Sequence, residues 1–244
     1  TDNWVPSSSN VKPQIADQVA LGYYQNLKKN MYRVSGEIYY KSLANQIDYR
    51  NGAELILNNQ VEGDLVFGKG RAYGFEFLLE KKKGKFTGWL SYTLSRSLRT
   101  FADINEGKEF SARQDRIHDI AIVMMYKINK SLAISGTWIY YTGDAITFPS
   151  GKYEINGTFI PYYTERNGYR MPDYHRMDIG LTWYLKDKKK FEHNLNISIY
   201  NLYARENAFT ITFEEDPDDS SKTQAVQTTL FKLIPSITYN FKLK

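Results

Sequence analysis

Apolar and polar residues alternate along most of this chain, whereas apolar residues at helical spacing are almost absent. Leu195, Ile197 and Ile199 alternate with polar neighbours, and the same pattern runs through 176–185 and 231–243. Successive side chains of a strand point to opposite faces, so each segment has one apolar and one polar face. The pattern predicts an all-β chain of about nine strands. They are expected at 15–27, 30–48, 70–82, 85–98, 115–127, 130–144, 172–186, 190–204 and 227–243.

The connections between the predicted strands alternate in length. The short ones are 28–29, 83–84, 129 and 187–189, and the long ones are 49–69, 99–114, 145–171 and 205–226. If consecutive strands are antiparallel neighbours, all short connections lie on one rim and all long ones on the other. This arrangement is typical of outer-membrane barrels, with short periplasmic turns and long extracellular loops. The alternative, a soluble β-sandwich, has no reason to sort its connections in this way. We therefore predict an antiparallel transmembrane β-barrel segment.

The two faces of the strands differ in chemistry. Apolar side chains that we expect to face lipid are Leu195, Ile197, Ile199, Ile179, Leu181, Trp183, Ile134 and Trp138. The polar face carries many charges, which suit a wet or plugged lumen better than a dry core. Side chains expected to face the lumen are Arg33, Glu37, Glu76, Glu80, Asp119, Arg176, Asp178 and Lys232. Aromatic residues expected at the interface near the tight turns include Trp89, Tyr126 and Trp183.

The composition of the chain excludes several kinds of site and of protein. The 244 residues include 32 basic and 27 acidic side chains and no Cys. The absence of Cys excludes disulfides and thiolate metal sites, and the modest charge of +5 argues against a nucleic-acid partner. The longest apolar run, Ile120 to Tyr126, is far shorter than the roughly 20 residues that a membrane-spanning helix needs.

The ends of the chain suggest a larger protein. The first residues lack the basic and apolar segments of a secretory signal, so we expect either a cytoplasmic protein or an amino terminus that lies elsewhere. An odd number of strands would leave edges open in lipid, and bacterial single-chain barrels have an even number. We therefore expect the chain to be the carboxy-terminal part of a larger barrel.

Several stretches, taken in order, resemble TonB-dependent outer-membrane receptors. They are SSSNVKPQIADQ (7–18) with LGY (21–23), GRAYGFE (70–76), RQDRIHD (113–119), YTG (141–143), YRMPDYHRMDIG (169–180) and YNLY (200–203). Each motif alone is weak, but their order extends the resemblance over essentially the whole chain.

The resemblance implies a barrel of about 22 strands that encloses an amino-terminal plug. Residues 1–244 would then be the carboxy-terminal portion, without the plug and about thirteen earlier strands. Such receptors lie in the outer membrane of Gram-negative bacteria, among lipid and lipopolysaccharide. They take up scarce nutrients such as iron chelates, vitamins, oligosaccharides or peptides, driven by the TonB complex. The alternative is a non-transporting barrel that serves as a scaffold or subunit of a membrane assembly.

The sequence shows no catalytic or metal-binding pattern. The three histidines, His118, His175 and His193, are not at metal-ligand spacing, and each is expected to form hydrogen bonds near a strand end. No Ser lies in a nucleophile elbow and no Gly-rich loop resembles a phosphate cradle. We therefore expect no enzyme, no metal and no cofactor. The acidic run 214–219 could hold Ca²⁺, but a solvated surface loop is the favoured interpretation.

Two further groups of residues carry functional expectations. The long loop 145–171 contains tyrosines and arginines, the residue types that dominate binding hot spots. Its candidate ligand-binding residues are Tyr153, Tyr162, Tyr163, Arg166, Tyr169 and Arg170; alternatively, they brace the loop or contact lipopolysaccharide. In such barrels the insertion machinery recognises the final strand by pairing along its edge. Its expected signal is Phe231, Leu233, Ile237, Tyr239 and Phe241.

Overall fold

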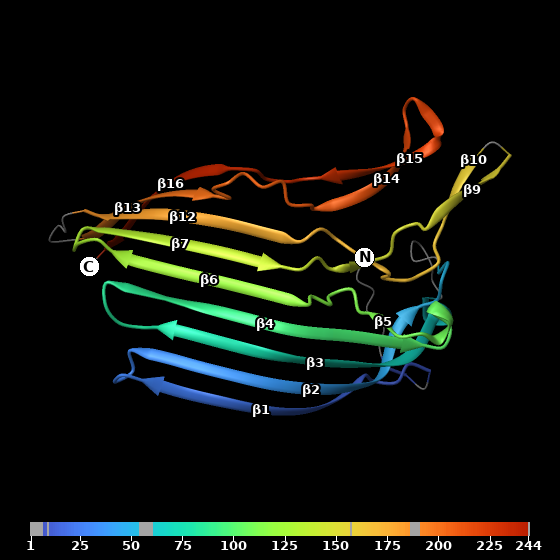
Figure 1. Cartoon of the computed structure of the whole chain (residues 1–244), viewed down its shortest axis with the longest axis horizontal. Helices are drawn as coiled ribbons and strands as arrows, with labels where there is room; N and C mark the ends of the chain where they lie inside the picture. The colour runs from blue at the N-terminus through green and yellow to red at the C-terminus, as the bar shows by residue number, and fades with distance from the viewer. Residues whose placement is uncertain (1–6, 9, 54–60, 157, 186–190, 244) are drawn as a thin grey trace.

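Nine long antiparallel strands form one sheet, side by side in chain order (Figure 1). The computed structural model describes residues 7–8, 10–53, 61–156, 158–185 and 191–243. The strands are β1 (Ile15–Leu27), β2 (Tyr32–Tyr49), β3 (Leu65–Lys81), β4 (Phe86–Phe101), β6 (His118–Lys127), β7 (Leu132–Tyr141), β12 (Tyr174–Tyr184), β13 (Phe191–Tyr200) and β16 (Ile234–Leu243). The predicted all-β antiparallel fold is confirmed. Within the described part of the chain, β1 and β16 form the two edges and do not pair with each other.

The tight turns and the long connections lie at opposite ends of the strands, at the left and right of Figure 1. Lys28, Lys29 and Asn30 join β1 to β2 with φ values of 48°, 54° and 63°. Gly84, with φ of 108°, lies in the turn between β3 and β4. Its missing side chain permits this left-handed conformation. The predicted turn 187–189 lies outside the described residues.

The long connections contain small elements of their own. The connection between β2 and β3 ends in the 3₁₀ helix η1 (Val61–Asp64). The next contains η2 (Asn105–Gly107) and β5 (Phe110–Ser111), which pairs with β4. Between β7 and β12 lie β8 (Ala145–Ile146) paired with β11 (Tyr169–Arg170), and β9 (Gly151–Ile155) paired with β10 (Thr158–Tyr162). No helix among the described residues is long and apolar enough to cross a membrane.

The acidic run is part of a hairpin and not an irregular loop. The hairpin consists of β14 (Thr210–Asp216) and β15 (Asp219–Thr228). Glu214 pairs with Gln224 and Glu215 pairs with Thr223. Glu214, Glu215 and Asp218 are exposed, as expected of a solvated surface segment, but the backbone of Glu214 and Glu215 is paired and does not form an irregular loop.

The register separates the apolar and polar residues onto two faces. Leu181 pairs with Ile134 on one side and Ile197 on the other, and Ile197 pairs with Ile237. All eight residues that were expected to face lipid share this face. On the opposite face Glu37 pairs with Glu76, and Arg33 pairs with Glu80. Arg176, Asp178 and Asp119 share this polar face by the same register.

Trp89 departs from the predicted pattern. It pairs with Glu80 and Val123 and therefore lies on the polar face, because the register brings Leu90, not Trp89, opposite Leu79. The apolar face packs against no second sheet in the described part of the chain. The buried apolar cluster lies instead at the loop end of the sheet and consists of Val66 of β3, Phe101 of β4, Ile104 and Phe110 of β5. These observations do not fit a β-sandwich with its core between two sheets.

The final strand is shorter than predicted. Gln227 and Thr228 pair with Ile211 and Thr210 in the hairpin, so the chain must turn before β16 begins. Phe231, Lys232 and Leu233 therefore lie outside the strand, and their assignment to its two faces is wrong. Ile237, Tyr239 and Phe241 do lie in β16 and alternate as expected.

Candidate ligand-binding site

The base of the loop 145–171 is fastened by Arg170. Its Nη1 donates hydrogen bonds to the backbone oxygens of Asp115 at 2.6 Å and Gly143 at 3.0 Å. Its Nη2 donates to the carboxylate of Asp115. Arg170 therefore joins the end of this loop to the connection between β4 and β6.

Asp115 is the centre of this junction. Its side chain is 0% exposed. Its Oδ1 accepts a hydrogen bond from the backbone N–H of Ser97 at 2.5 Å, and its Oδ2 lies 3.4 Å from Nε of Arg96. A buried carboxylate requires such pairing, because its desolvation would otherwise be costly. We call Asp115, Arg96 and Arg170 the buried-aspartate junction.

Arg166 fastens the same loop to a distant part of the chain. Its Nη1 donates to Oδ1 of Asp48 and to the backbone oxygen of Tyr49, both at 2.7 Å. Its Nη2 donates to Asn51 at 2.9 Å, and its backbone N–H donates to Asn105 at 2.8 Å. The guanidinium groups of Arg166 and Arg170 are thus both engaged in bracing the loop.

The tyrosines of the predicted site are exposed and do not form one cluster. Tyr153 and Tyr162 face each other across the β9–β10 hairpin, with ring centroids 6.4 Å apart. Tyr169 lies beside Phe148 at 5.8 Å, and Phe148 contacts Phe213 of β14 at 4.9 Å. A groove of about 730 Å³ runs between the two hairpins and is lined by Phe148, Phe159, Phe213 and Tyr163, among others.

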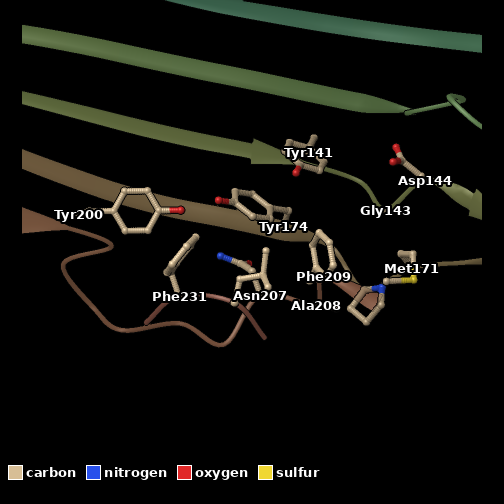
Figure 2. A pocket seen from close by; sticks show the side chains of 12 residues that line it. Tyr141, Gly143, Asp144, Met171, Tyr174, Tyr200, Asn207, Ala208, Phe209 and Phe231 are labelled. Carbon is tan, nitrogen blue, oxygen red and sulfur yellow. The ribbon is translucent and has the colours of Figure 1, made fainter. Parts of the chain in front are cut away.

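A second cavity lies on the polar face, where three strands end at the long connections. It measures about 410 Å³. Tyr141, Tyr174 and Tyr200, from β7, β12 and β13, line one side, and the facing side carries Phe209 and Phe231 (Figure 2). Other lining residues are Gly143, Asp144, Met171, Pro172, Asn207, Ala208 and Leu230. We call this cavity the tyrosine pocket.

Two arginines, Arg116 and Arg176, pack against rings of the tyrosine pocket. The guanidinium of Arg116 lies 3.8 Å from the centroid of Tyr141, which stacks on Tyr174 at 4.7 Å. Arg116 also forms two hydrogen bonds with Asp144, at 2.6 and 3.3 Å, and these raise the pKa of the guanidinium. The guanidinium of Arg176 lies 4.1 Å from the ring of Tyr200 and pairs with Asp178 at 2.9 Å. Both cations therefore support the rings and are neutralised locally.

Asn207 holds the facing segment of the pocket against β12. Its Nδ2 donates to the backbone oxygen of His175 at 3.0 Å, and its Oδ1 accepts from the N–H of the same residue at 3.2 Å. Asn201 adds a bond from Nδ2 to the backbone oxygen of Lys232 at 3.1 Å. Lys232 itself forms an ion pair with Glu206 and does not lie on the polar face of a strand.

Several of the remaining predicted residues form pairs of their own. Nη1 of Arg33 lies 4.0 Å from Glu80, and Glu37 accepts a hydrogen bond from the hydroxyl of Tyr24. The Nδ1 atoms of His118, His175 and His193 lie within 3.0 Å of the hydroxyls of Tyr92, Tyr203 and Tyr239. Among the described residues no group of three or more metal-ligating side chains is found.

The tyrosine pocket was not predicted from the sequence. Tyr140 and Tyr141 are adjacent, and only the register shows that Tyr141 lies on the polar face while Tyr140 lies on the apolar one. The YTG and YRMPDYH stretches contain Tyr141, Gly143, Met171 and Tyr174. They indicated the family resemblance in this region but gave no sign of a cavity.

The architecture defines a class of protein. One layer of long antiparallel strands, apolar on one face and polar on the other, with tight turns at one end and folded loops at the other, is the wall of an outer-membrane-type β-barrel. The chain belongs to the TonB-dependent receptor-like β-barrel family, whose sequence model matches residues 1–202. Barrels of this family are outer-membrane proteins of Gram-negative bacteria. No curated protein matches the sequence.

Solved structures of similar fold include several iron receptors. The ferripyoverdine receptor of Pseudomonas aeruginosa is 11% identical, with a TM-score of 0.60 over 99% of this chain and 29% of the receptor. The closed form of the ferric-catecholate import receptor Fiu of Escherichia coli K12 is 14% identical, with 0.56 over 98% and 30%. The iron transporter FrpB of Neisseria meningitidis is 14% identical, with 0.54 over 97% and 31%. The chain thus spans about 30% of their length, and at this identity they show the fold.

Proposed function

We propose that this chain is the carboxy-terminal barrel portion of an outer-membrane receptor that imports a scarce nutrient with energy from the TonB complex. Its membership of the TonB-dependent receptor-like β-barrel family is the observation that carries the proposal. The loop end of the sheet supports it, because two cavities large enough for a small ligand open there.

The proposal gives each face and rim a role. The apolar face contacts lipid, and the polar face with Glu37, Glu76, Arg176 and Asp178 lines the lumen around a plug. The exposed loop tyrosines contact ligand or lipopolysaccharide, while Arg166 and Arg170 brace the loop. The strand β16 is the edge recognised by the insertion machinery, through Ile237, Tyr239 and Phe241.

Uptake by whole cells tests the proposal. Wild-type cells, cells lacking the gene and cells lacking TonB are compared for accumulation of labelled ferric chelates, cobalamin, oligosaccharides and peptides. We expect one of these to accumulate only when both the receptor and TonB are present. If none does, and the protein co-purifies in a stable membrane assembly, the chain belongs to a scaffold and the proposal fails.

A further inference from the structure

Most charged side chains around the tyrosine pocket are paired, although Arg205, which donates to Asn207 and to the backbone oxygen of Asp173, has no carboxylate partner among the described residues. Asp144 is the one formally charged residue among those that line it, and Arg116 neutralises it through two hydrogen bonds. Behind Tyr200, Arg176 pairs with Asp178, and beyond Phe231, Lys232 pairs with Glu206. The pocket therefore offers no unpaired cation from the residues that line it.

The walls combine flat aromatic faces with hydroxyl groups. Phe209 and Phe231 are 63% and 58% exposed, which leaves large parts of both side chains available for contact. Tyr141 and Tyr174 form a stacked pair opposite them, with an angle of 1° between the rings. Arg176 donates to the hydroxyls of Tyr174 and Tyr200, at 3.1 and 2.8 Å, and so fixes both.

Polar groups remain for a ligand. The hydroxyls of Tyr174 and Tyr200 also form a hydrogen bond with each other, so one of their two protons is left to donate to a ligand. Within the described part of the chain, the hydroxyl of Tyr141 has no hydrogen-bond partner. The carboxylate of Asp144 is 42% exposed, so its oxygens can accept further bonds in addition to those from Arg116. Donors and acceptors thus surround an aromatic floor.

We infer that the tyrosine pocket binds an uncharged, hydroxyl-bearing ring, namely a sugar unit of a neutral oligosaccharide. A sugar ring has C–H-rich faces that pack on aromatic rings, and hydroxyls at its edge that bond to Tyr and Asp oxygens. An anionic ferric chelate would instead need unpaired cations, because its charge is costly to desolvate. The cavity volume of about 410 Å³ lies in the range of small-molecule sites. This inference rests on the proposed function, since it names the class of ligand that the receptor takes.

Binding to the intact purified receptor tests the inference separately from transport. Maltodextrin, cellodextrin and mannan oligosaccharides serve as neutral probes and a ferric tris-catecholate as the anionic one, with affinities measured by calorimetry in detergent. We expect saturable binding of at least one neutral probe and none of the catecholate. Phe209→Ala and Tyr174→Ala should each weaken that binding by about tenfold or more, because each removes an aromatic face.

Matched variants keep the result interpretable. Tyr184→Ala removes a tyrosine from the same strand and the same face, at the tight-turn end, and should leave the affinity unchanged. Phe209 lies outside the strands, so its variant tests the pocket even if Tyr174→Ala fails to fold. Catecholate binding without saccharide binding overturns the inference, and so does saccharide binding that Phe209→Ala does not alter. Saccharide binding without TonB-dependent uptake would leave the inference standing and refute the proposed function.

Discussion

Asp115→Asn is the most informative test of how the long loops are held. Asn has nearly the same shape and can still accept the hydrogen bond from the N–H of Ser97, but it lacks the negative charge. The positive guanidinium groups of Arg96 and Arg170 would then repel each other, because the carboxylate that pairs with both would be absent. The substitution therefore isolates the electrostatic part of the buried-aspartate junction.

The expected cost follows from burial. Removing one partner of a buried ion pair typically costs about 3–5 kcal/mol. Arg96 and Arg170 are 37% and 29% exposed, so water screens both partly. We therefore expect the free energy of local opening of the loop 145–171 to fall by about 2 kcal/mol. This corresponds to an open population about thirtyfold larger.

Hydrogen exchange measured on the intact receptor can detect this change. The amides of Ala145 and Met171 close the base of the loop, bonding to Arg113 and Asp144 at 3.2 and 3.0 Å. Peptides that contain them should exchange about thirtyfold faster in the variant. Asp103→Asn, on an exposed aspartate of the same rim, is the control and should exchange at the wild-type rate. An Asp115→Asn rate within about threefold of wild type would refute the reasoning.

Three further predictions concern the faces, the last strand and the loop base. A cysteine placed at Glu76 should react with a membrane-impermeant thiol reagent in cells, whereas one at Ile197 should be shielded by lipid; equal labelling would contradict the assignment of the faces. The double substitution Tyr239→Ala and Phe241→Ala should lower the amount of heat-modifiable receptor in outer-membrane fractions, whereas removal of the last three residues should not. Gly143→Ala should speed exchange at the loop base by about tenfold or more, because a Cβ there would lie 1.7 Å from a backbone oxygen; unchanged exchange would show that the backbone adjusts without cost.

The alternation of apolar and polar side chains predicted most strands of the sheet correctly. It failed where residues alternate but form no backbone hydrogen bonds with a neighbouring strand. The strands expected at 15–27 and 30–48 are observed at Ile15–Leu27 and Tyr32–Tyr49. At 231–233 apolar and polar residues still alternate, yet the backbone has left the sheet. Alternation reflects only the chemistry of the side chains, whereas a strand also needs a hydrogen-bonded neighbour. Here the preceding residues, up to Thr228, belong to β15 and pair with β14, so the chain must turn before it can join the sheet.

The candidate ligand-binding site was less predictable than the sheet, because its residues are far apart in the sequence and come together only in the folded structure. On composition alone, Arg166 fits ligand contact and loop bracing equally well, and its bonds to Asp48 and Tyr49 are seen only in the structure. The tyrosine pocket depends on which of two adjacent tyrosines points to the polar face. A one-residue shift of register would have put Tyr140 there instead of Tyr141.

The bond between Arg166 and Asp48 also bears on the order in which the protein folds. Each long strand pairs with its neighbour in the chain, so the sheet can grow by successive local steps. Arg166 and Asp48, in contrast, are separated by 118 residues. In the folded sheet, β3, β4, β6 and β7 lie between the strand that holds Asp48 and the loop that holds Arg166. We therefore expect this contact to form late in folding. The time at which the loop around Arg166 becomes protected from hydrogen exchange would then report when this part of the sheet is complete.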